Sequence, residues 1–251
     1  MNKPRRKAAR PTSPWCALAA AAILAVLGLT GCITVPVDGG EPTGTPGHAT
    51  PLSYVDRLKA TPVAPPGDEA ATTELSQFIT DSRNIACVFT ASRAGHLNQP
   101  WEPNNFNDTA NVAAPTIPVV TCQMVSYPQV QAADVHDNCA GTNVGYLGGV
   151  ATLLPDKSLY GACRAGVSAM EAAFGARGTV NQAMGSIPVL APGAAMESQG
   201  YRCAPMDDGV ACANLASGAG FFIAADTYEL FAAGNTATSA GATPPAPAAA
   251  G

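Results

Sequence analysis

The chain of 251 residues has little of what enzymes and nucleic-acid-binding proteins usually need. Only 12% of its residues are charged, and it has three histidines, His48, His96 and His136. It contains no Gly-x-Ser-x-Gly nucleophile motif and no phosphate-binding loop. A catalytic triad sets a histidine between a nucleophile and a carboxylate, and only His136 has acidic neighbours. We therefore predict no catalytic residue and no cofactor.

Basic residues are scarce after the first ten positions. Five of the 13 Lys and Arg stand there, as Lys3, Arg5, Arg6, Lys7 and Arg10. From Cys32 onward, eight basic residues face 18 acidic ones, which gives a net charge of −10. Because so acidic a chain is repelled by phosphate backbones, we expect no nucleic-acid partner.

The sequence also lacks an apolar run long enough for a transmembrane helix, which needs about 20 residues. Its longest run, 15–29, follows the basic residues and is typical of a signal peptide. The run ends in Leu29-Thr30-Gly31-Cys32, which resembles the lipobox of bacterial lipoproteins. Small residues before the cysteine admit the peptidase, and the thiol becomes a lipid thioether. An ordinary secretory signal with a chance cysteine is the alternative.

The lipobox predicts a signal peptide over 1–31 and an acylated (palmitate-type) Cys32 on the outer face of the plasma membrane. Two or three acyl chains anchor stably, at about 0.8 kcal/mol per buried CH₂. Residues 32–71 are rich in Pro, Gly and Thr and predict a flexible tether, with at most a helical turn at 54–58. A β domain is expected at 72–233, followed by a disordered Ala/Gly/Pro tail at 234–251.

Six cysteines follow Cys32, and an even number in an exported chain favours three disulfides. The segments 201–205 and 210–214 flank Met206-Asp207-Asp208-Gly209, which predicts a hairpin with Gly209 at positive φ. Pairing 205 with 210 places Cys203 opposite Cys212. Sequential pairing would join Cys87 to Cys122 and Cys139 to Cys163. A zinc site is the alternative, but no Cys-x-x-Cys occurs.

Most of the remaining pattern predicts strands. Apolar alternation or β-branched residues mark 85–90, 117–125, 150–154, 159–163 and 221–223. Pro118 and Pro188 indicate strand ends or edges, and the glycines of 145–149 favour a strand with close backbone packing. Helices are expected within 165–176, where Val167, Met170 and Phe174 share a face, and near 74–79. The fold class is therefore mainly β: a small, disulfide-stabilised antiparallel sheet or barrel-like domain with one or two short helices.

The cysteine contexts resemble a family of uncharacterised, cysteine-paired exported domains and lipoproteins of high-GC Gram-positive, mycobacterial-type bacteria. The matching residues are Asn84-Ile85-Ala86-Cys87, Tyr201-Arg202-Cys203, Gly209-Val210-Ala211-Cys212-Ala213-Asn214 and Gly218-Ala219-Gly220-Phe221. The resemblance spans roughly 78–231, with longer segments between Cys87 and Cys122 and between Cys163 and Cys203. It implies export and the cysteine-paired fold, and it supplies no catalytic residue.

Two local features are candidate sites. Asp134, His136 and Asp137 could bind a divalent cation, although a solvated loop beside a disulfide explains them as well. Trp101 stands in a long polar loop and could contact a sugar or a partner, or it could anchor its own loop.

Together these patterns predict a non-catalytic envelope lipoprotein. Its partners would be the membrane, through the lipid, and an envelope protein, glycan or lipid. A hydrolase acting on envelope material is the alternative, as is an inhibitor or accessory subunit that inserts the loop 91–116 into an envelope enzyme.

Overall fold

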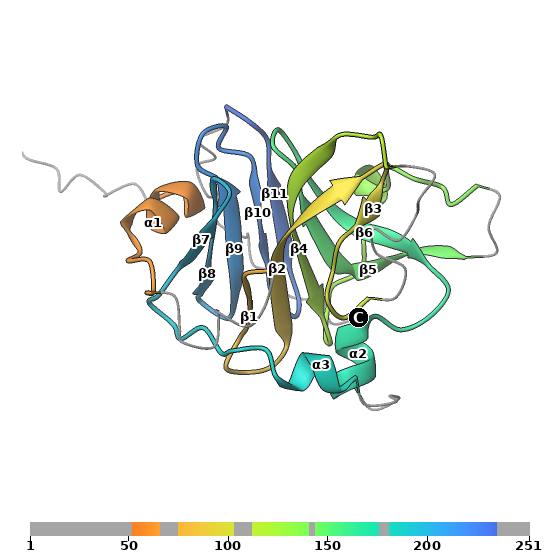
Figure 1. The fold of residues 1–251 in the computed structure, drawn as a ribbon, viewed down its shortest axis with the longest axis horizontal. Coiled ribbons are helices and arrows are strands. Elements are labelled where there is room, and N and C mark those ends of the chain that lie inside the picture. Colours follow the sequence, from red (N-terminus) through yellow and green to blue (C-terminus); the bar gives the residue numbers. More distant parts are fainter. Residues whose placement is uncertain (1–51, 66–74, 103–111, 141–143, 176–180, 235–251) are drawn as a thin grey trace, which may run out of the picture. The chain divides into compact units, whose positions relative to one another are not determined.

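Two antiparallel β-sheets and a few short helices form the structure (Figure 1). The computed structural model describes residues 52–65, 75–102, 112–140, 144–175 and 181–234, which belong to one unit of the chain. The predicted signal peptide, Cys32, most of the tether and the tail beyond 234 lie outside the described residues. The mainly β class with antiparallel sheets is confirmed.

The first sheet has the strand order β1-β2-β4-β5-β6, with β3 paired to β2. Its strands are β1 (Gln77–Ile79), β2 (Ile85–Arg93), β3 (His96–Leu97), β4 (Thr116–Met124), β5 (Gly145–Leu153) and β6 (Ser158–Arg164). β4 is central, yet it pairs with β5 only from Val120 to Gln123. Pro118 therefore lies where β4 has a partner strand on one side alone, which fits its predicted position at a strand end.

The second sheet runs in the order β11-β10-β9-β8-β7, so each strand pairs with its neighbour in the chain. Its strands are β7 (Met196–Ser198), β8 (Tyr201–Met206), β9 (Gly209–Asn214), β10 (Gly220–Ile223) and β11 (Tyr228–Phe231). Pro205 pairs with Val210 and Cys203 with Cys212, as the hairpin argument predicts.

The predicted role of Gly209 is wrong. The hairpin turn consists of Asp207 and Asp208, because Met206 pairs directly with Gly209, and Asp207 takes the positive φ of 52°. Gly209 is required for another reason. A Cβ at this position would lie 2.2 Å from the carbonyl oxygen of Ile223 in β10, so only glycine lets these two strands approach.

The sheets pack face to face around one core, in which β5 contacts β9 and β10, and β6 contacts β11. Phe89 and Val120 of the first sheet share this core with Tyr201 and Phe221 of the second. Burying such side chains in place of leaving them in water contributes about 1.5–3 kcal/mol each.

Three disulfides hold the domain: Cys87–Cys122, Cys139–Cys163 and Cys203–Cys212. The first joins paired residues of β2 and β4, and the third joins paired residues of β8 and β9. They meet in the core, where Cys122 Sγ lies 4.0 Å from Cys212 Sγ. Cys139–Cys163 instead fastens the connection before β5 to strand β6.

The helices are α1 (Tyr54–Ala60), the 3₁₀ turn η3 (Ala132–Asp134), α2 (Ala169–Phe174) and α3 (Gln182–Gly185). Helix α2 begins later than expected because Ser168 and Glu171 form a capping box. Val167 therefore precedes the helix and is exposed, whereas Met170 is fully buried. The helix predicted near 74–79 is wrong, since Gln77–Ile79 form β1 by pairing with β2.

Helix α1 belongs to the folded domain, although the sequence places it in the tether. Ser53 caps it through the backbone N–H of Asp56, and Val55 and Leu58 are buried against the second sheet. Arg57 and Arg202 add polar contacts to the hairpin turn and to the end of the helix. Burial of one apolar side chain per helical turn is therefore enough to hold this helix on the second sheet, although the flanking sequence is rich in proline.

We expect Leu58→Ala to lower the free energy of unfolding by about 3 kcal/mol, because Leu58 is fully buried and its loss leaves a cavity. Urea denaturation followed by circular dichroism measures this change. The matched control is Lys59→Ala on the exposed face, which should shift stability by less than about 0.5 kcal/mol. Equal stability of both variants would show that α1 does not contribute to the domain.

Candidate functional site

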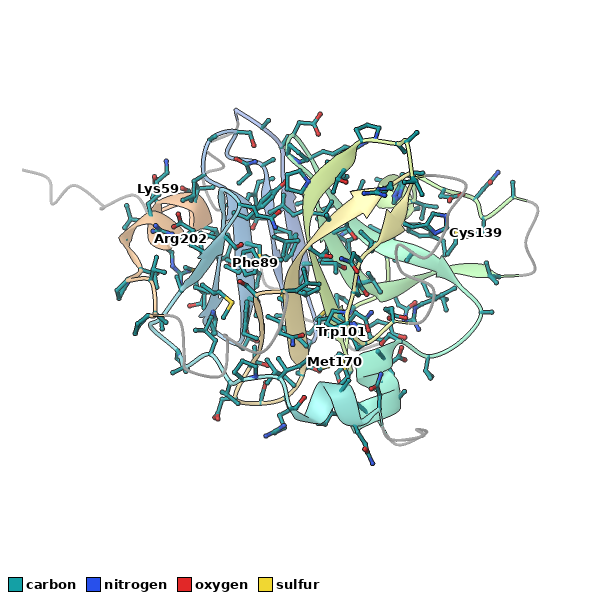
Figure 2. The ribbon with its side chains drawn as sticks, viewed as in Figure 1. Lys59, Phe89, Trp101, Cys139, Met170 and Arg202 are labelled. Carbon is teal, nitrogen blue, oxygen red and sulfur yellow. A yellow bond between two sulfur atoms is a disulfide. The ribbon has the colours of Figure 1, made fainter. Side chains whose placement is uncertain are left out.

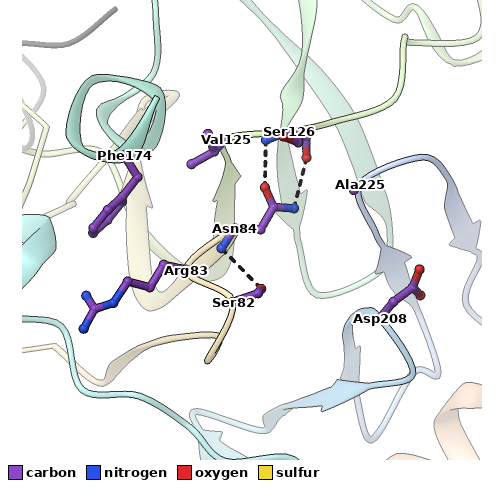
Figure 3. Close-up of a pocket in the computed structure, with 8 residues that line it drawn as sticks. All are labelled: Ser82, Arg83, Asn84, Val125, Ser126, Phe174, Asp208 and Ala225. Carbon is purple, nitrogen blue, oxygen red and sulfur yellow. Dashed lines mark hydrogen bonds between the residues drawn. The ribbon is translucent and has the colours of Figure 1, made fainter. Parts of the chain in front are cut away.

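A pocket of about 540 Å³ opens at the end of the two sheets where four connections converge. The β1–β2 turn, the exit of β4, the β8–β9 hairpin and the β10–β11 turn all contribute to it. Helix α2 adds its last residue (Figure 3). The lining residues are Ser82, Arg83, Asn84, Val125, Ser126, Phe174, Asp208 and Ala225. Loops carried by a rigid β framework are a common place for binding sites.

Asn84 fixes the wall on the side of the first sheet. Its side chain accepts from the backbone N–H of Ser126 at 2.7 Å and donates to the carbonyl of Ser126 at 3.1 Å. The backbone N–H of Asn84 donates to Ser82 Oγ at 3.4 Å. These bonds tie the β1–β2 turn to the exit of β4 (Figure 3), so this wall is set before any ligand arrives.

Two opposite charges face the solvent at the pocket. Arg83 has a left-handed backbone, with φ 53°, and its guanidinium carbon lies 5.7 Å from the centre of the Phe174 ring. Asp208 is exposed and forms no hydrogen bond or ion pair with any described residue. Its neighbour Asp207 differs, since Arg57 donates to both of its carboxylate oxygens at 2.9 and 3.0 Å. The Arg57 hydrogen bond lowers the pKa of Asp207 despite partial burial.

The predicted cation ligands Asp134, His136 and Asp137 are not assembled into a site. The Tyr228 hydroxyl donates to Asp134, Tyr146 Oη lies 2.5 Å from His136 Nδ1, and Asp137 accepts from the N–H of Cys139. Among the described residues, no group of metal-binding side chains includes Asp134 or His136, and the group with Asp137 contains two disulfide-bonded cysteines. These contacts order the segment that connects β4 to β5.

Of the two interpretations of Trp101, contact with a ligand or packing within its own loop, the structure fits the second. The indole is 5% exposed and packs with Met170, Ile79 and Met184 beneath the first sheet (Figure 2). Asn181 Nδ2 donates to its carbonyl at 3.2 Å. Trp101 anchors its own loop, because so large an apolar ring is stabilised more by burial than by contact with water.

Arg164, Glu171 and Tyr127 form a hydrogen-bonded cluster near the pocket, and this cluster has a structural role. Arg164 donates to Glu171 Oε2 at 2.7 Å, to Tyr127 Oη at 2.8 Å and to the carbonyl of Gly148 at 2.9 Å. Burial alone would raise the pKa of Glu171. The N–H of Ser168, the Arg164 charge and the Tyr127 hydroxyl outweigh it and hold this pKa below its ordinary value. The group fastens α2 to β5 and β6.

This lowered pKa predicts a pH dependence. Because Glu171 titrates lower in the folded state, its ionised form stabilises the fold at neutral pH, and this stabilisation is lost as pH falls through the folded pKa. We expect Glu171→Gln to cost about 2 kcal/mol at pH 7. The difference from the unsubstituted protein should shrink towards pH 3.5, measured by urea denaturation at each pH. The exposed Asp226→Asn serves as control, and a pH-independent deficit would contradict the assignment.

The sequence does not mark the pocket residues as a site. Asn84 stands out only as part of the motif before Cys87, and the helix expected near 74–79 leaves the β1–β2 turn with Arg83 unrecognised. The sequence indicates Asp208 first as a turn residue and only distantly as a ligand. Turn-forming residues between two strand patterns are the signal in the sequence that indicates these loops. Which of the turns lie close together depends on how the two sheets pack.

No protein-family model matches the chain, and no match to a curated protein or to a solved structure is found. The resemblance found in its cysteine motifs therefore stays a prediction. Within the described ranges, no helix is long and apolar enough to cross a membrane. The three disulfides indicate an extracytoplasmic protein, because such bonds form and persist in oxidising compartments.

Proposed function

We propose that this chain is a cell-envelope lipoprotein, held on the outer face of the plasma membrane by Cys32, whose β domain binds a partner without catalysing a reaction. The observation that carries the binding role is the pocket at the end of the two sheets where the β1–β2, β8–β9 and β10–β11 turns converge. It combines a fixed wall with two exposed charges, Arg83 and Asp208, on a framework held by disulfides. The lipobox and the disulfides support the location.

The pocket favours binding over hydrolysis. Its lining consists of short polar side chains, the apolar Val125, Phe174 and Ala225, and two opposite charges, and His136 does not contribute to it. A nucleophile needs a base within hydrogen-bond reach. No lining residue is a histidine or a cysteine, so the lining offers neither a histidine base nor a thiol nucleophile.

Cys32→Ser is expected to release the protein from the membrane fraction, because the acyl chains on the thiol supply the anchor. Fractionation with immunodetection measures the change, and intact mass should show di- or triacylated Cys32 as the first residue of the membrane-bound form. Cys16→Ser is the matched control and should remain anchored, because Cys16 lies within the signal peptide. Retention of Cys32→Ser in the membrane, or an unmodified Cys32, would contradict the proposed anchor.

Binding at the pocket is tested by photo-crosslinking in whole cells. A photoreactive side chain at position 225, which lines the pocket, is expected to give envelope adducts. The same side chain at Lys157, in the β5–β6 turn at the far end of the sheet, serves as control. Adducts of equal yield and identity from both positions, or none from position 225, would contradict the binding role.

A further inference from the structure

We propose that the Cys139–Cys163 disulfide is a thiol-exchange site, at which a low-molecular-weight thiol replaces Cys139 on the sulfur of Cys163. The exchange releases the segment 131–140 from the edge of the first sheet. This site is separate from the pocket, so the proposal goes beyond the binding function.

The three disulfides differ in their access to solvent. All four cysteines of the other two bridges are fully buried between the sheets. Cys139, by contrast, is 5% exposed, and Cys163 is partly exposed. Figure 2 shows Cys139 at the rim of the domain, away from the core residue Phe89. Because a thiolate must reach the sulfur that it attacks, this bridge is the one that an external thiol reaches first in the folded protein.

The segment 131–140 depends on this bridge for its position. Its cysteine is buried, whereas its other side chains are exposed or half-buried. Two tyrosines bond to it from the sheets: Tyr228 to Gln131 and Asp134, and Tyr146 to His136. Hydrogen bonds near the surface contribute little net stability, because water competes for the same groups. A segment with so little buried apolar surface opens locally once its crosslink is gone.

The two cysteines differ in how their backbones are held, and this sets the direction of exchange. Cys163 is part of β6 and pairs with Tyr146 of β5. Cys139 lies in the connecting segment with φ 56°, a left-handed conformation that residues other than glycine seldom adopt. Exchange at Cys163 leaves the new bond on the fixed strand and lets the backbone of Cys139 relax.

The reaction needs only the thiol. Its thiolate attacks the sulfur of Cys163, forms a mixed disulfide there and expels Cys139 as a thiolate, which takes a proton from water. One S–S bond forms and one breaks, so no separate oxidant or reductant is consumed.

The opening is confined to the segment 131–140. The Tyr160 hydroxyl donates to the carbonyl of Pro128 at 2.8 Å. Gly161 has no side chain, and a Cβ there would lie 2.9 Å from Val130 Cγ2, so Val130 packs directly on β6. Both contacts precede residue 131 and do not involve the bridge. The pocket wall at 125–126 therefore stays in place, and the crosslinks from position 225 do not depend on the exchange.

The test treats the full chain with its three disulfides with reduced glutathione, stops samples at early times with iodoacetamide and maps the cysteines by non-reducing mass spectrometry. We expect glutathione on Cys163 and the alkyl group on Cys139, at a rate at least about a hundredfold above that of either buried bridge. The two buried bridges in the same samples are the internal control. Glutathione on Cys139 instead, no adduct on Cys163, or equally fast opening of a buried bridge overturns the proposal.

Release of the segment is measured separately with a protease that cleaves before aspartate. Cleavage before Asp134 and Asp137 should become at least about tenfold faster after exchange, because an opened segment fits a protease better than a fastened one. Cleavage before Asp226, in the β10–β11 turn, should stay unchanged. The double variant Cys139→Ser with Cys163→Ser should show the same fast cleavage without glutathione and keep both buried bridges. Unchanged cleavage before Asp134 and Asp137 in the exchanged protein would show that the bridge does not hold the segment.

Discussion

Replacing Cys87 and Cys122 together by alanine is expected to lower the free energy of unfolding by about 4 kcal/mol. The two residues are 35 positions apart, and a bridge that closes so long a loop strongly restricts the unfolded chain. Both are fully buried between the sheets. For a domain of this size the melting temperature should fall by about 10 °C. Urea denaturation with matched thermal melts measures both quantities.

The control is the same double replacement at Cys203 and Cys212. These cysteines are equally buried but only nine positions apart, so the expected loss is smaller, about 2.5 kcal/mol. Equal losses at both bridges would show that packing of the sulfur atoms, and not loop length, decides their contribution.

The second large effect is expected at Tyr160, whose replacement by alanine should cost about 4 kcal/mol. Its ring is fully buried and stacks on Tyr228 with the ring centres 4.0 Å apart. Its hydroxyl donates to the carbonyl of Pro128 at 2.8 Å and accepts from the N–H of Gly149 at 3.1 Å. Burial raises the pKa of Tyr160 to about 12, so the hydroxyl remains protonated at neutral pH.

Tyr160→Phe separates the two contributions. It keeps the ring but leaves the carbonyl of Pro128 and the N–H of Gly149 without this partner, which should cost about 1–3 kcal/mol. Chemical denaturation of both variants supplies the comparison. A phenylalanine variant as stable as the unsubstituted protein would mean that the hydroxyl does not hold the 127–131 segment on β5.

The parts of the fold that were predictable are those encoded in neighbouring residues. The alternation of Ile85, Cys87 and Phe89 marks β2, and the register at Cys203 and Cys212 follows from the hairpin between them. β1 was not predictable in this way, because a strand of three residues carries almost no periodicity. It exists because the edge of β2 offers it hydrogen bonds.

The candidate site was less predictable for a related reason. Arg83 and Asp208 are 125 positions apart, and nothing near either residue in the sequence indicates that the two sheets bring their turns together. Trp101 shows where the sequence leaves a choice open: its polar neighbours are compatible with an exposed or a buried ring, and only tertiary packing decides for burial. The sequence places helix α1 in the tether because prolines surround it, but the burial of Val55 and Leu58 against the second sheet overrides that composition.

The contact between Cys122 and Cys212 also has a chemical consequence. A thiolate released at Cys122 by reduction would already stand 4.0 Å from a sulfur of the other bridge. Attack on Cys212 would form a Cys122–Cys212 bond and release Cys203 as the new thiolate. The crosslink would then run from one sheet to the other instead of between neighbouring strands. The two disulfides are therefore not chemically independent. Once the Cys87–Cys122 bond is reduced, the isomer with a Cys122–Cys212 bond forms without a large change in the backbone.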